Sequence, residues 1–442
     1  MKRTLYQELV KWKKSKSRKP LILQGARQVG KTWLMKDFGQ NEFDQTAYFN
    51  FESNKNLDEI FRRDLDPNRI IKALEIIYGK KINTNSTLIV FDEIQSCPQA
   101  ITSLKYFYEF NPNLFILAAG SLLGIAIHQG ISFPVGKVTF LELQPMGFSE
   151  FLSAIKENSL LEVLEKDDKT ILPSFENQLI NLLKIYFFVG GMPEVVKGYS
   201  ENKDLIEVRH LQENILKAYE NDFSKHDPAS QLPRIRLVWQ SIVGQLAKEN
   251  SKFIYSIMRS GARAKEFEMA IEWLKDAGLI RKVTRITKPG LPLSTYASWQ
   301  DFKIYLNDTG LLCAMASLSP ELVLKGNSLF NEFKGILTEQ YILQTLILFG
   351  YPGFYWNPEN AQAEVDFVIA KNNTVIPIEV KSAENVRSRS LRVFYEKYKP
   401  KICIRTSLSG YKDQEWMTNI PLYSFSQWLA GKQSGSQKNP TE

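Results

Sequence analysis

Short apolar segments alternate with helical patterns over the first 150 residues of the chain. The apolar segments are rich in strand-forming residues and lie at 21–25, 46–52, 88–93, 114–121 and 138–143. Helical patterns such as IIKALEIIYG and PQAITSLKYFYEF separate them. Strands that are apolar on both faces and alternate with helices are typical of a parallel sheet covered on two sides. Residues 1–150 are therefore predicted to form an α/β domain.

The pattern changes after residue 150. Residues 151–235 have helical periodicity, interrupted by a Gly-Gly-Met-Pro turn at 190–193. Residues 236–320 are predicted to form two helices followed by a strand pair. In the second of these helices Phe267, Ile271 and Leu274 fall on one face, and Gly278 is expected to end it. Two helices followed by a basic hairpin indicate a winged helix.

The pattern from 321 to 430 predicts a third kind of domain. An amphipathic helix, FKGILTEQYILQTLILFG, is followed by two apolar strands that are predicted to form a hairpin turning about Asn372-Asn373. With that turn, Asp366 is expected to lie opposite Val380. Residues 431–442 are small and polar, and we expect them to be disordered.

Composition narrows the class of protein only slightly. The 442 residues include 56 Lys and Arg against 48 Asp and Glu, a net charge of +8 that is compatible with an anionic partner without requiring one. The three cysteines are far apart, without metal-ligand or redox spacing, so free thiols in a reducing compartment are expected. Apolar runs stay well short of the ~18 residues of a membrane span. A cytoplasmic protein with no membrane partner is predicted.

A phosphate-binding motif follows the first predicted strand. Residues Gly25, Ala26, Arg27, Gln28, Val29, Gly30, Lys31 and Thr32 fit G-x-x-x-x-G-K-[ST] and lead into the helical pattern TWLMKDFG. The glycines let backbone amides surround phosphates beside the positive end of the helix. Lys31 would reach the β- and γ-phosphates, and the Thr32 hydroxyl would hold Mg²⁺. The cofactors predicted from this motif are ATP and Mg²⁺.

Two carboxylates end the strand LIVFDE, sixty residues after the phosphate motif. Asp92 would belong to the magnesium shell, and Glu93 would orient or polarise the attacking water. The strand LFILAAGS ends at Ser121, whose hydroxyl could contact the γ-phosphate or the water, or could simply cap the next segment. Together these residues predict an ATPase.

At this point a resemblance emerges that spans nearly the whole chain. GARQVGKT, LIVFDEIQ, the AAGS strand end and PVGKVTFLELQPMGFSEFL are similar to a prokaryotic group of AAA-type ATPases. YENDFSKH and FKIYLNDTGLL also resemble patterns of this group, whose members carry a C-terminal domain of unknown function with a restriction-endonuclease-like fold. The resemblance implies a P-loop sheet, a helical lid, a winged-helix domain and a nuclease-like α/β domain. Gly136-Lys137 stands where the group usually has Gly-Arg, so an arginine finger is not expected there.

The C-terminal hairpin carries charged residues inside apolar strands. Glu379 and Lys381 share one face of their strand, and Asp366 lies on the strand before it. This is the D…E-x-K arrangement of restriction-type nucleases, in which Asp366 and Glu379 would bind Mg²⁺ and Lys381 would position the water. Glu339 in the preceding helix matches the additional acid that such domains often carry. A structural Glu–Lys pair, or an inert binding module of the same fold, accounts for these residues too.

Two functions remain open at the level of sequence. In the first, an ATP-dependent machine acts on DNA, which basic residues of the winged helix would contact through its phosphates: Arg259, Arg263, Lys265, Arg281, Lys282 and Arg285. In the second, these residues form a solvated face, the nuclease-like domain is inert, and ATP drives a conformational switch or a protein-interaction module. The sequence does not determine the oligomeric state.

Overall fold

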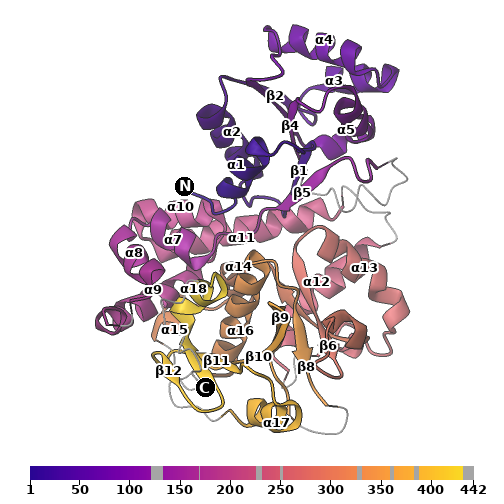
Figure 1. The fold of residues 1–442 in the computed structure, drawn as a ribbon. Coiled ribbons are helices and arrows are strands. Elements are labelled where there is room, and N and C mark those ends of the chain that lie inside the picture. Colours follow the sequence, from indigo (N-terminus) through magenta and orange to yellow (C-terminus); the bar gives the residue numbers. More distant parts are fainter. Residues whose placement is uncertain are drawn as a thin grey trace. The chain divides into compact units, whose positions relative to one another are not determined.

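A computed structural model describes residues 1–120, 133–168, 170–224, 231–248, 252–325, 331–358, 363–382 and 388–431 (Figure 1). The chain divides into two compact units. The first consists of residues 2–144 together with 272–279, and the second holds residues 145–271 and those from 280 on. Each unit is described by itself below.

The first unit is built on a five-stranded sheet in which all neighbouring strands are parallel. Its strand order is β2 (Gln45–Asn50), β3 (Thr87–Asp92), β4 (Phe115–Ala119), β1 (Leu21–Gln24) and β5 (Thr139–Glu142). The five strands predicted from apolar segments are therefore confirmed, with bounds that differ by one or two residues. Strand β1 lies inside the sheet, between β4 and β5, so that the loop after β1 leaves from an interior position on the carboxyl edge.

Helices cover both faces of this sheet (Figure 1). On one face, α3 (Lys55–Arg63), α4 (Pro67–Tyr78) and α5 (Pro98–Phe110) bury Phe61, Leu74 and Phe107 in a cluster with strand residues such as Phe91. On the other face lie α1 (Tyr6–Lys14) and α2 (Lys31–Glu42). There Trp12 contacts Phe38 of α2 and Phe115 of β4, with ring centroids 6.4 and 6.3 Å away.

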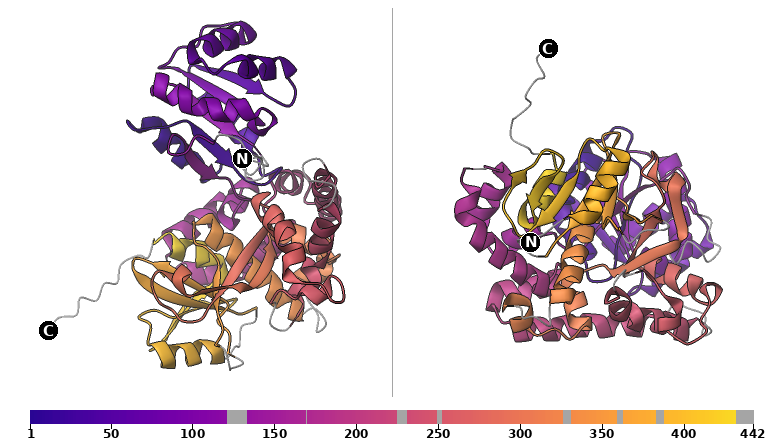
Figure 2. Two further views of the ribbon diagram at one scale, coloured as in Figure 1. Left: turned by 90° about the vertical axis from the view of Figure 1, so that its right-hand side faces the viewer. Right: turned by 90° about the horizontal axis from the view of Figure 1, so that it is seen from below.

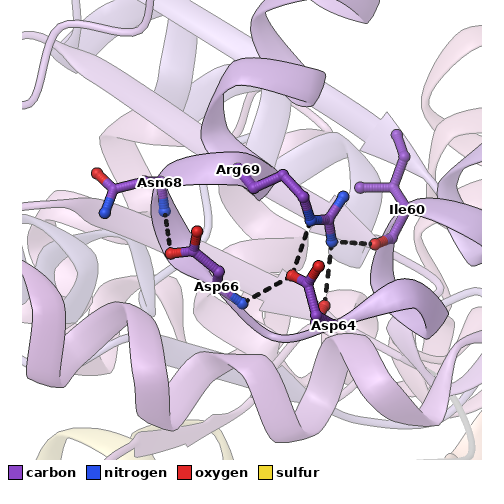
Figure 3. Close-up of polar contacts among 5 residues, drawn as sticks. All are labelled: Ile60, Asp64, Asp66, Asn68 and Arg69. Atoms are coloured by element: carbon purple, nitrogen blue, oxygen red, sulfur yellow. Dashed lines mark hydrogen bonds and ion pairs between the residues drawn. The ribbon is translucent and has the colours of Figure 1, made fainter.

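Hydrogen bonds among polar side chains and the backbone fix the turn between α3 and α4 (Figure 3). Arg69 donates from Nε to Asp64 Oδ1 at 2.7 Å and from Nη2 to the carbonyl of Ile60 at 2.6 Å. Asp66 caps α4 by accepting from the amide of Asn68 at 3.1 Å. The turn therefore holds the last residues of α3 against the first turn of α4.

The second unit begins with helices, as predicted for residues 151–235: α7 (Phe148–Ala154), α8 (Asn158–Lys166), α9 (Glu176–Val189), α10 (Pro193–Asn202) and α11 (Leu205–Asp222). Two further helices follow, α12 (Leu232–Leu246) and α13 (Ala264–Asp276), and the last residues of α13 belong to the first unit. The predicted turn at 190–193 separates α9 from α10. On α13, Phe267, Ile271 and Leu274 are all buried, which confirms the predicted apolar face.

Two sheets complete the second unit. The first has the order β7 (Ala297–Leu306), β6 (Ile280–Ile286), β8 (Phe354–Trp356). The second has the order β12 (Lys412–Asp413), β13 (Thr418–Pro421), β11 (Ile404–Ser407), β10 (Thr374–Val380), β9 (Phe367–Lys371). The accompanying helices are α14 (Thr309–Met315), α15 (Pro320–Lys325), α16 (Asn331–Leu348), α17 (Arg389–Tyr398) and α18 (Phe425–Leu429). Helices α16 and α17 both contact β10 (Figure 2).

The hairpin β9–β10 turns where the sequence predicts, but its register differs by one residue. Asn372 and Asn373 both have positive φ, 50° and 59°, as a two-residue hairpin turn requires. Because Ile378 pairs with Phe367, the same register brings Asp366, directly before β9, opposite Glu379. The prediction that Asp366 faces Val380 is therefore wrong. The prediction had centred the turn on a residue, whereas the turn is centred between the two asparagines.

Two expectations from composition can be compared with the structure. Cys97, Cys313 and Cys403 are buried free thiols, as the sequence predicts. Across the described ranges, helices are too short or too polar to cross a bilayer.

A buried carboxylate ties three parts of the second unit together. Asp308 has no exposed surface, caps α14 by accepting from the amide of Leu311 at 3.0 Å, and accepts from the amide of Gly191 at 2.6 Å. At Gly190 a Cβ would come within 2.1 Å of Asp308 Oδ1, so only glycine fits beside the carboxylate. Burial raises the pKa of Asp308 to about 6, although hydrogen bonds from these amides act in the opposite direction.

The raised pKa of Asp308 predicts a pH-dependent contribution to stability. Because the folded-state pKa of Asp308 lies above the unfolded value, the protonated carboxyl stabilises the fold fully below about pH 4. This stabilisation is lost as the pH rises through 6, and the free energy of unfolding falls by up to about 3 kcal/mol. Asp308→Asn removes the titrating group. We expect the difference in unfolding free energy between wild type and Asp308→Asn to fall between pH 4 and 6.5. Denaturant melts across that range test this, and a constant difference would contradict it.

Candidate nucleotide site and acidic cluster

The loop between β1 and α2 has the backbone that a phosphate cradle needs. Gly25, Gln28 and Gly30 all have positive φ, at 142°, 65° and 93°. A Cβ at Gly25 would lie 2.3 Å from the carbonyl oxygen of Leu143, so the loop packs directly against the chain that leaves β5. Helix α2 begins at Lys31 without a side-chain cap at Gly30. Its first amides are therefore oriented to bind an anion.

Lys31 folds back onto its own loop. Its Nζ donates to the carbonyls of Gly25 and Ala26, both at 2.8 Å, and only 7% of its surface is exposed. Burial lowers the pKa of Lys31 to about 8, although the charges of Glu93 and Asp92 act in the opposite direction. The ammonium is held by neutral carbonyl acceptors that a phosphate could replace.

The two predicted magnesium ligands meet at the carboxyl edge of the sheet. The Thr32 hydroxyl donates to Asp92 Oδ2 at 2.7 Å. The same oxygen accepts from the Tyr48 hydroxyl, also at 2.7 Å, because β2 and β3 pair in a register that sets these strand ends side by side. Asp92 is buried. The burial of Tyr48 itself, together with its hydrogen bond to Asp92, raises the pKa of Tyr48 to about 12. The structure thus brings a hydroxyl and a carboxylate together at the position where the motif expects Mg²⁺.

Glu93 follows directly and adopts an unusual backbone. Its φ is 52°, a left-handed conformation that is costly for a residue with a side chain. Its amide donates to Asp92 Oδ1 at 3.1 Å, and its Oε2 accepts from Gln95 Nε2 at 2.6 Å. The surrounding bonds therefore hold the carboxylate in a defined orientation next to Asp92.

Several residues support this site without having been predicted. The sequence analysis placed Tyr48 only in a strand, β2, and gave Gln95, which follows β3, no role. Their polar side chains near the ends of these strands were the signal that could have identified them. Arg3 is buried and donates to the carbonyls of Val29, at 2.8 Å, and Gln144, at 2.5 Å. No local pattern distinguishes it within the basic N-terminal segment. Gly278, also in the first unit, lies against the loop, where a Cβ would be 3.2 Å from the Ala26 nitrogen.

Two further positions singled out in the sequence are Ser121 and Lys137. Ser121 lies outside the described residues. Lys137 forms an ion pair with Glu109 at 3.1 Å, and both belong to the first unit.

The predicted acidic residues of the second unit come together around the end of β10. Glu379 is buried, pairs with Lys381 Nζ through Oε1 at 2.7 Å, and accepts from the amide of Leu391 at 3.0 Å. Asp366 Oδ2 accepts from the amide of Val380 at 2.6 Å. The hairpin and the first turn of α17 thus bring the D…E-x-K residues into one place.

Strand β7 adds two residues that the sequence analysis missed. The Tyr305 hydroxyl donates to Glu339 Oε2 at 2.7 Å, and Lys303 Nζ donates to Glu364 Oε1 at 2.5 Å. Lys303 and Tyr305 are two residues apart, hence on one face of the strand, and both are buried. The signal was the alternation in FKIYL, where a lysine and a tyrosine interrupt the apolar positions.

These groups form one acidic cluster, comprising Glu339, Glu364, Asp366, Glu379, Lys303 and Lys381. Burial raises the pKa of Asp366 well above its usual range, and the negative charges of Glu339 and Glu379 raise it further. The positive charge of Lys381 acts in the opposite direction. Burial alone would lower the pKa of Lys303, but the charges of Glu364, Glu339 and Asp366 outweigh it and raise the pKa. Four carboxylates thus face two lysines. Such an excess fits a divalent cation, although among the described residues no three acidic, histidine or cysteine side chains are arranged to hold one.

Of the six basic residues predicted to contact DNA, Arg281 and Lys282 are half-buried, and Lys282 Nζ lies over the ring of Phe302 at 4.3 Å. The other four divide into two sets. Arg259 pairs with Glu266 at 2.7 Å, and Arg285 pairs with Asp301 at 2.9 Å. Arg285 is mostly buried, so its guanidinium faces protein. Arg263 and Lys265 are exposed.

The parallel sheet, the cradle after β1 and the bond between Thr32 and Asp92 have the arrangement of a P-loop domain. Residues 17–152 match the AAA domain family. Residues 180–322 match a domain of unknown function (DUF8612), and residues 334–425 match another (DUF4143). Among curated proteins, no relative matches the chain.

Three solved structures with distant similarity to the chain have sequence identities of 15% or less. The Walker-type ATPase of Pyrococcus abyssi is 14% identical, with a TM-score of 0.44, covering 70% of this chain and 94% of its own. The ORC1 protein of Aeropyrum pernix, solved in complex with DNA, is 12% identical, with a TM-score of 0.28 and coverages of 71% and 90%. AMPPCP-bound DnaA from Aquifex aeolicus is 15% identical, with a TM-score of 0.24 and coverages of 62% and 88%.

The lowered pKa of Lys31 predicts pH-dependent nucleotide affinity. Phosphates would stabilise the ammonium and raise its pKa above the value of about 8 in the free protein. Binding then takes up a proton above pH 8, and the affinity for ATP should fall by up to about tenfold per pH unit there. Isothermal titration calorimetry at pH 7.0 to 9.5, in buffers of different ionisation enthalpy, measures both effects. An unchanged Kd without proton uptake at pH 9 would contradict the expectation.

Proposed function

We propose that the first unit binds ATP with Mg²⁺ at residues 25–32 and hydrolyses it. The observation that carries the proposal is the hydrogen bond between Thr32 and Asp92, 2.7 Å long, beside a lysine whose Nζ donates to two loop carbonyls. When bound, Mg²⁺ would neutralise charge on the β- and γ-phosphates. Thr32 and Asp92 are the residues that would hold it.

The roles of the remaining residues follow from their positions. Lys31 would exchange the carbonyls of Gly25 and Ala26 for phosphate oxygens and stabilise charge on the transferred group. Glu93, held by Gln95, would orient the attacking water. Tyr48 would keep Asp92 oriented towards Thr32. Ser121 keeps its predicted role at the γ-phosphate as part of this proposal.

The ATPase proposal predicts different effects for two substitutions. Lys31→Ala should abolish nucleotide binding, because the buried cation that faces the phosphates is lost. Glu93→Gln should leave the Kd for ATP within about threefold while lowering kcat by about a hundredfold or more, because the carboxylate that orients water is lost. Binding is measured with a fluorescent ATP analogue, and turnover by phosphate release.

Two exposed residues provide matched controls for these substitutions. Lys72→Ala on α4 and Glu59→Gln on α3 make the same chemical changes away from the loop, and should leave both measurements unchanged. Unaltered nucleotide affinity in Lys31→Ala would remove the basis of the site assignment.

For the second unit we propose the arrangement predicted from the sequence. Residues 151–235 would form a helical lid, 236–320 a winged-helix domain, and 321–430 a restriction-endonuclease-like domain that acts on DNA. Support comes from α12 and α13 followed by the antiparallel pair β6–β7, and from the mixed sheet that carries Asp366 and Glu379. Asp366 and Glu379 would hold Mg²⁺, with Glu339 as the additional acid and Lys381 positioning the water.

One observation favours the alternative, an inert nuclease-like domain in a nucleotide-driven switch or protein-interaction module. Glu379 is paired with Lys381, and Asp366 accepts from the Val380 amide, so these carboxylates already have partners. Buried acids satisfied in this way also serve a purely structural role.

Cleavage assays distinguish the two readings. If the acidic cluster is catalytic, wild-type protein should cut single- or double-stranded DNA or RNA with Mg²⁺ or Mn²⁺, while Asp366→Ala and Lys381→Ala should reduce the rate at least a hundredfold. Gel analysis of end-labelled substrates measures this, with Lys397→Ala as a control for loss of an exposed lysine. Cleavage that survives both substitutions would indicate a contaminating enzyme, and no cleavage of any substrate would favour the switch.

A further inference from the structure

A tyrosine of β7 reaches the acidic cluster from outside the segment predicted to be nuclease-like. The Tyr305 hydroxyl donates to Glu339 Oε2 at 2.7 Å. An ionised carboxylate only accepts hydrogen bonds, so the hydroxyl is the donor. Tyr305 belongs to the segment predicted to form the winged helix, 236–320, whereas Glu339 lies on α16 in the segment after it. The orientation of this acid therefore depends on a strand of the preceding segment.

Tyr305 is itself fixed by packing. Only 1% of its surface is exposed, and its ring contacts Phe367, with centroids 6.4 Å apart. Phe367 directly follows Asp366, so this ring links the helix that carries Glu339 to the chain segment that carries Asp366. Because the tyrosine is enclosed by protein, it can act on a bound ligand only through the carboxylate that it holds.

A second bond attaches the same helix to the same strand. Gln340, next to Glu339 on α16, donates from Nε2 to the carbonyl of Leu306 at 2.7 Å and has no exposed surface. The helix is thus joined to β7 independently of the tyrosine. What the Tyr305 hydroxyl adds is a fixed direction for the Glu339 side chain, whose torsions would otherwise be free to rotate.

Glu339 and Asp366 each keep one oxygen for a ligand. Asp366 Oδ2 accepts from the amide of Val380 at 2.6 Å, as Glu339 Oε2 accepts from Tyr305. Within the described part of the chain no donor reaches Glu339 Oε1 or Asp366 Oδ1, and both side chains are only half-buried. The two carboxylates lie near each other, since the charge of Glu339 raises the pKa of Asp366. Mg²⁺ is usually held by one or two carboxylates, with water among its other ligands, so two free oxygens meet its needs.

We propose that Tyr305 is a positioning residue of the cation site in the acidic cluster: it holds Glu339 so that this additional acid shares the cation with Asp366. A partner that orients a metal ligand in this way commonly contributes about 10- to 100-fold to metal affinity. The inference rests on the cation site of the proposed nuclease-like function. It is therefore tested on cation binding, which is measured separately from cleavage.

The test is Mn²⁺ binding to the full-length protein without nucleotide, followed by the electron paramagnetic resonance signal of free Mn²⁺. The Mn²⁺ that wild type binds and Asp366→Ala does not defines the site. Tyr305→Phe keeps the buried ring and removes only the hydroxyl, and it should raise the Kd of this site about 10- to 100-fold. Glu339→Gln should raise it at least as much. In the Glu339→Gln background, adding Tyr305→Phe should change Kd by less than about threefold, because the tyrosine acts through this carboxylate.

The matched control is Tyr341→Phe on the same helix, which removes a buried hydroxyl that donates to the carbonyl of Leu422 at 3.2 Å. It should leave Kd unchanged, and thermal melts should show that all variants fold. The proposal is overturned if Asp366→Ala removes no bound Mn²⁺, if Tyr305→Phe leaves Kd unchanged, if Tyr341→Phe raises it as much, or if the effects of Tyr305→Phe and Glu339→Gln add.

The two proposals fail in different ways. Mn²⁺ binding that depends on Tyr305, without cleavage of any nucleic acid, would refute the nuclease-like function and leave the positioning role in place. Cleavage with an unchanged Mn²⁺ requirement in Tyr305→Phe would do the reverse.

Discussion

The carboxylate of Asp92 is the interaction on which the nucleotide site depends. It stands at the end of a buried strand and accepts hydrogen bonds from Thr32, on the helix after the phosphate loop, and from Tyr48, on the neighbouring strand. Three elements of the sheet domain therefore converge on one oxygen atom. Because a buried carboxylate is costly unless it is hydrogen-bonded, this convergence keeps the loop and the strand edge in register.

The second unit is organised by buried charge in a comparable way. Asp308 joins the turn at 190–191 to α14, and the acidic cluster joins β7 to α16 and the β9–β10 hairpin. Such groups fix the relative positions of elements more specifically than apolar packing does, because each donor needs its own acceptor. The same arrangement leaves Asp366 with a raised pKa and an excess of carboxylates nearby, which is the physical basis for considering a cation there.

The sequence predicted the phosphate loop of the nucleotide site, but not the residues that support the two candidate sites. The phosphate loop was readable because its function depends on local backbone conformation, which Gly25 and Gly30 allow and other residues do not. The supporting residues were not readable: Arg3, Tyr48 and Lys303 act across 26 or more residues of chain, or across neighbouring strands, and no short pattern records such contacts. The register error at Asp366 shows the same limit, since one residue in a turn moves every pair along the hairpin.

The sequence by itself determined the parallel sheet, its five strands, the phosphate loop and the acids at 92 and 93. Those features follow from local periodicity and from residues whose backbone or side-chain chemistry is specific. Only the tertiary structure decided that Lys31 rests on loop carbonyls, that Arg285 is paired with Asp301, and that lysines and tyrosines from three segments line one hollow. Charges far apart in the chain acquire a partner, a shifted pKa or a shared surface only when folding brings them within a few ångströms of each other.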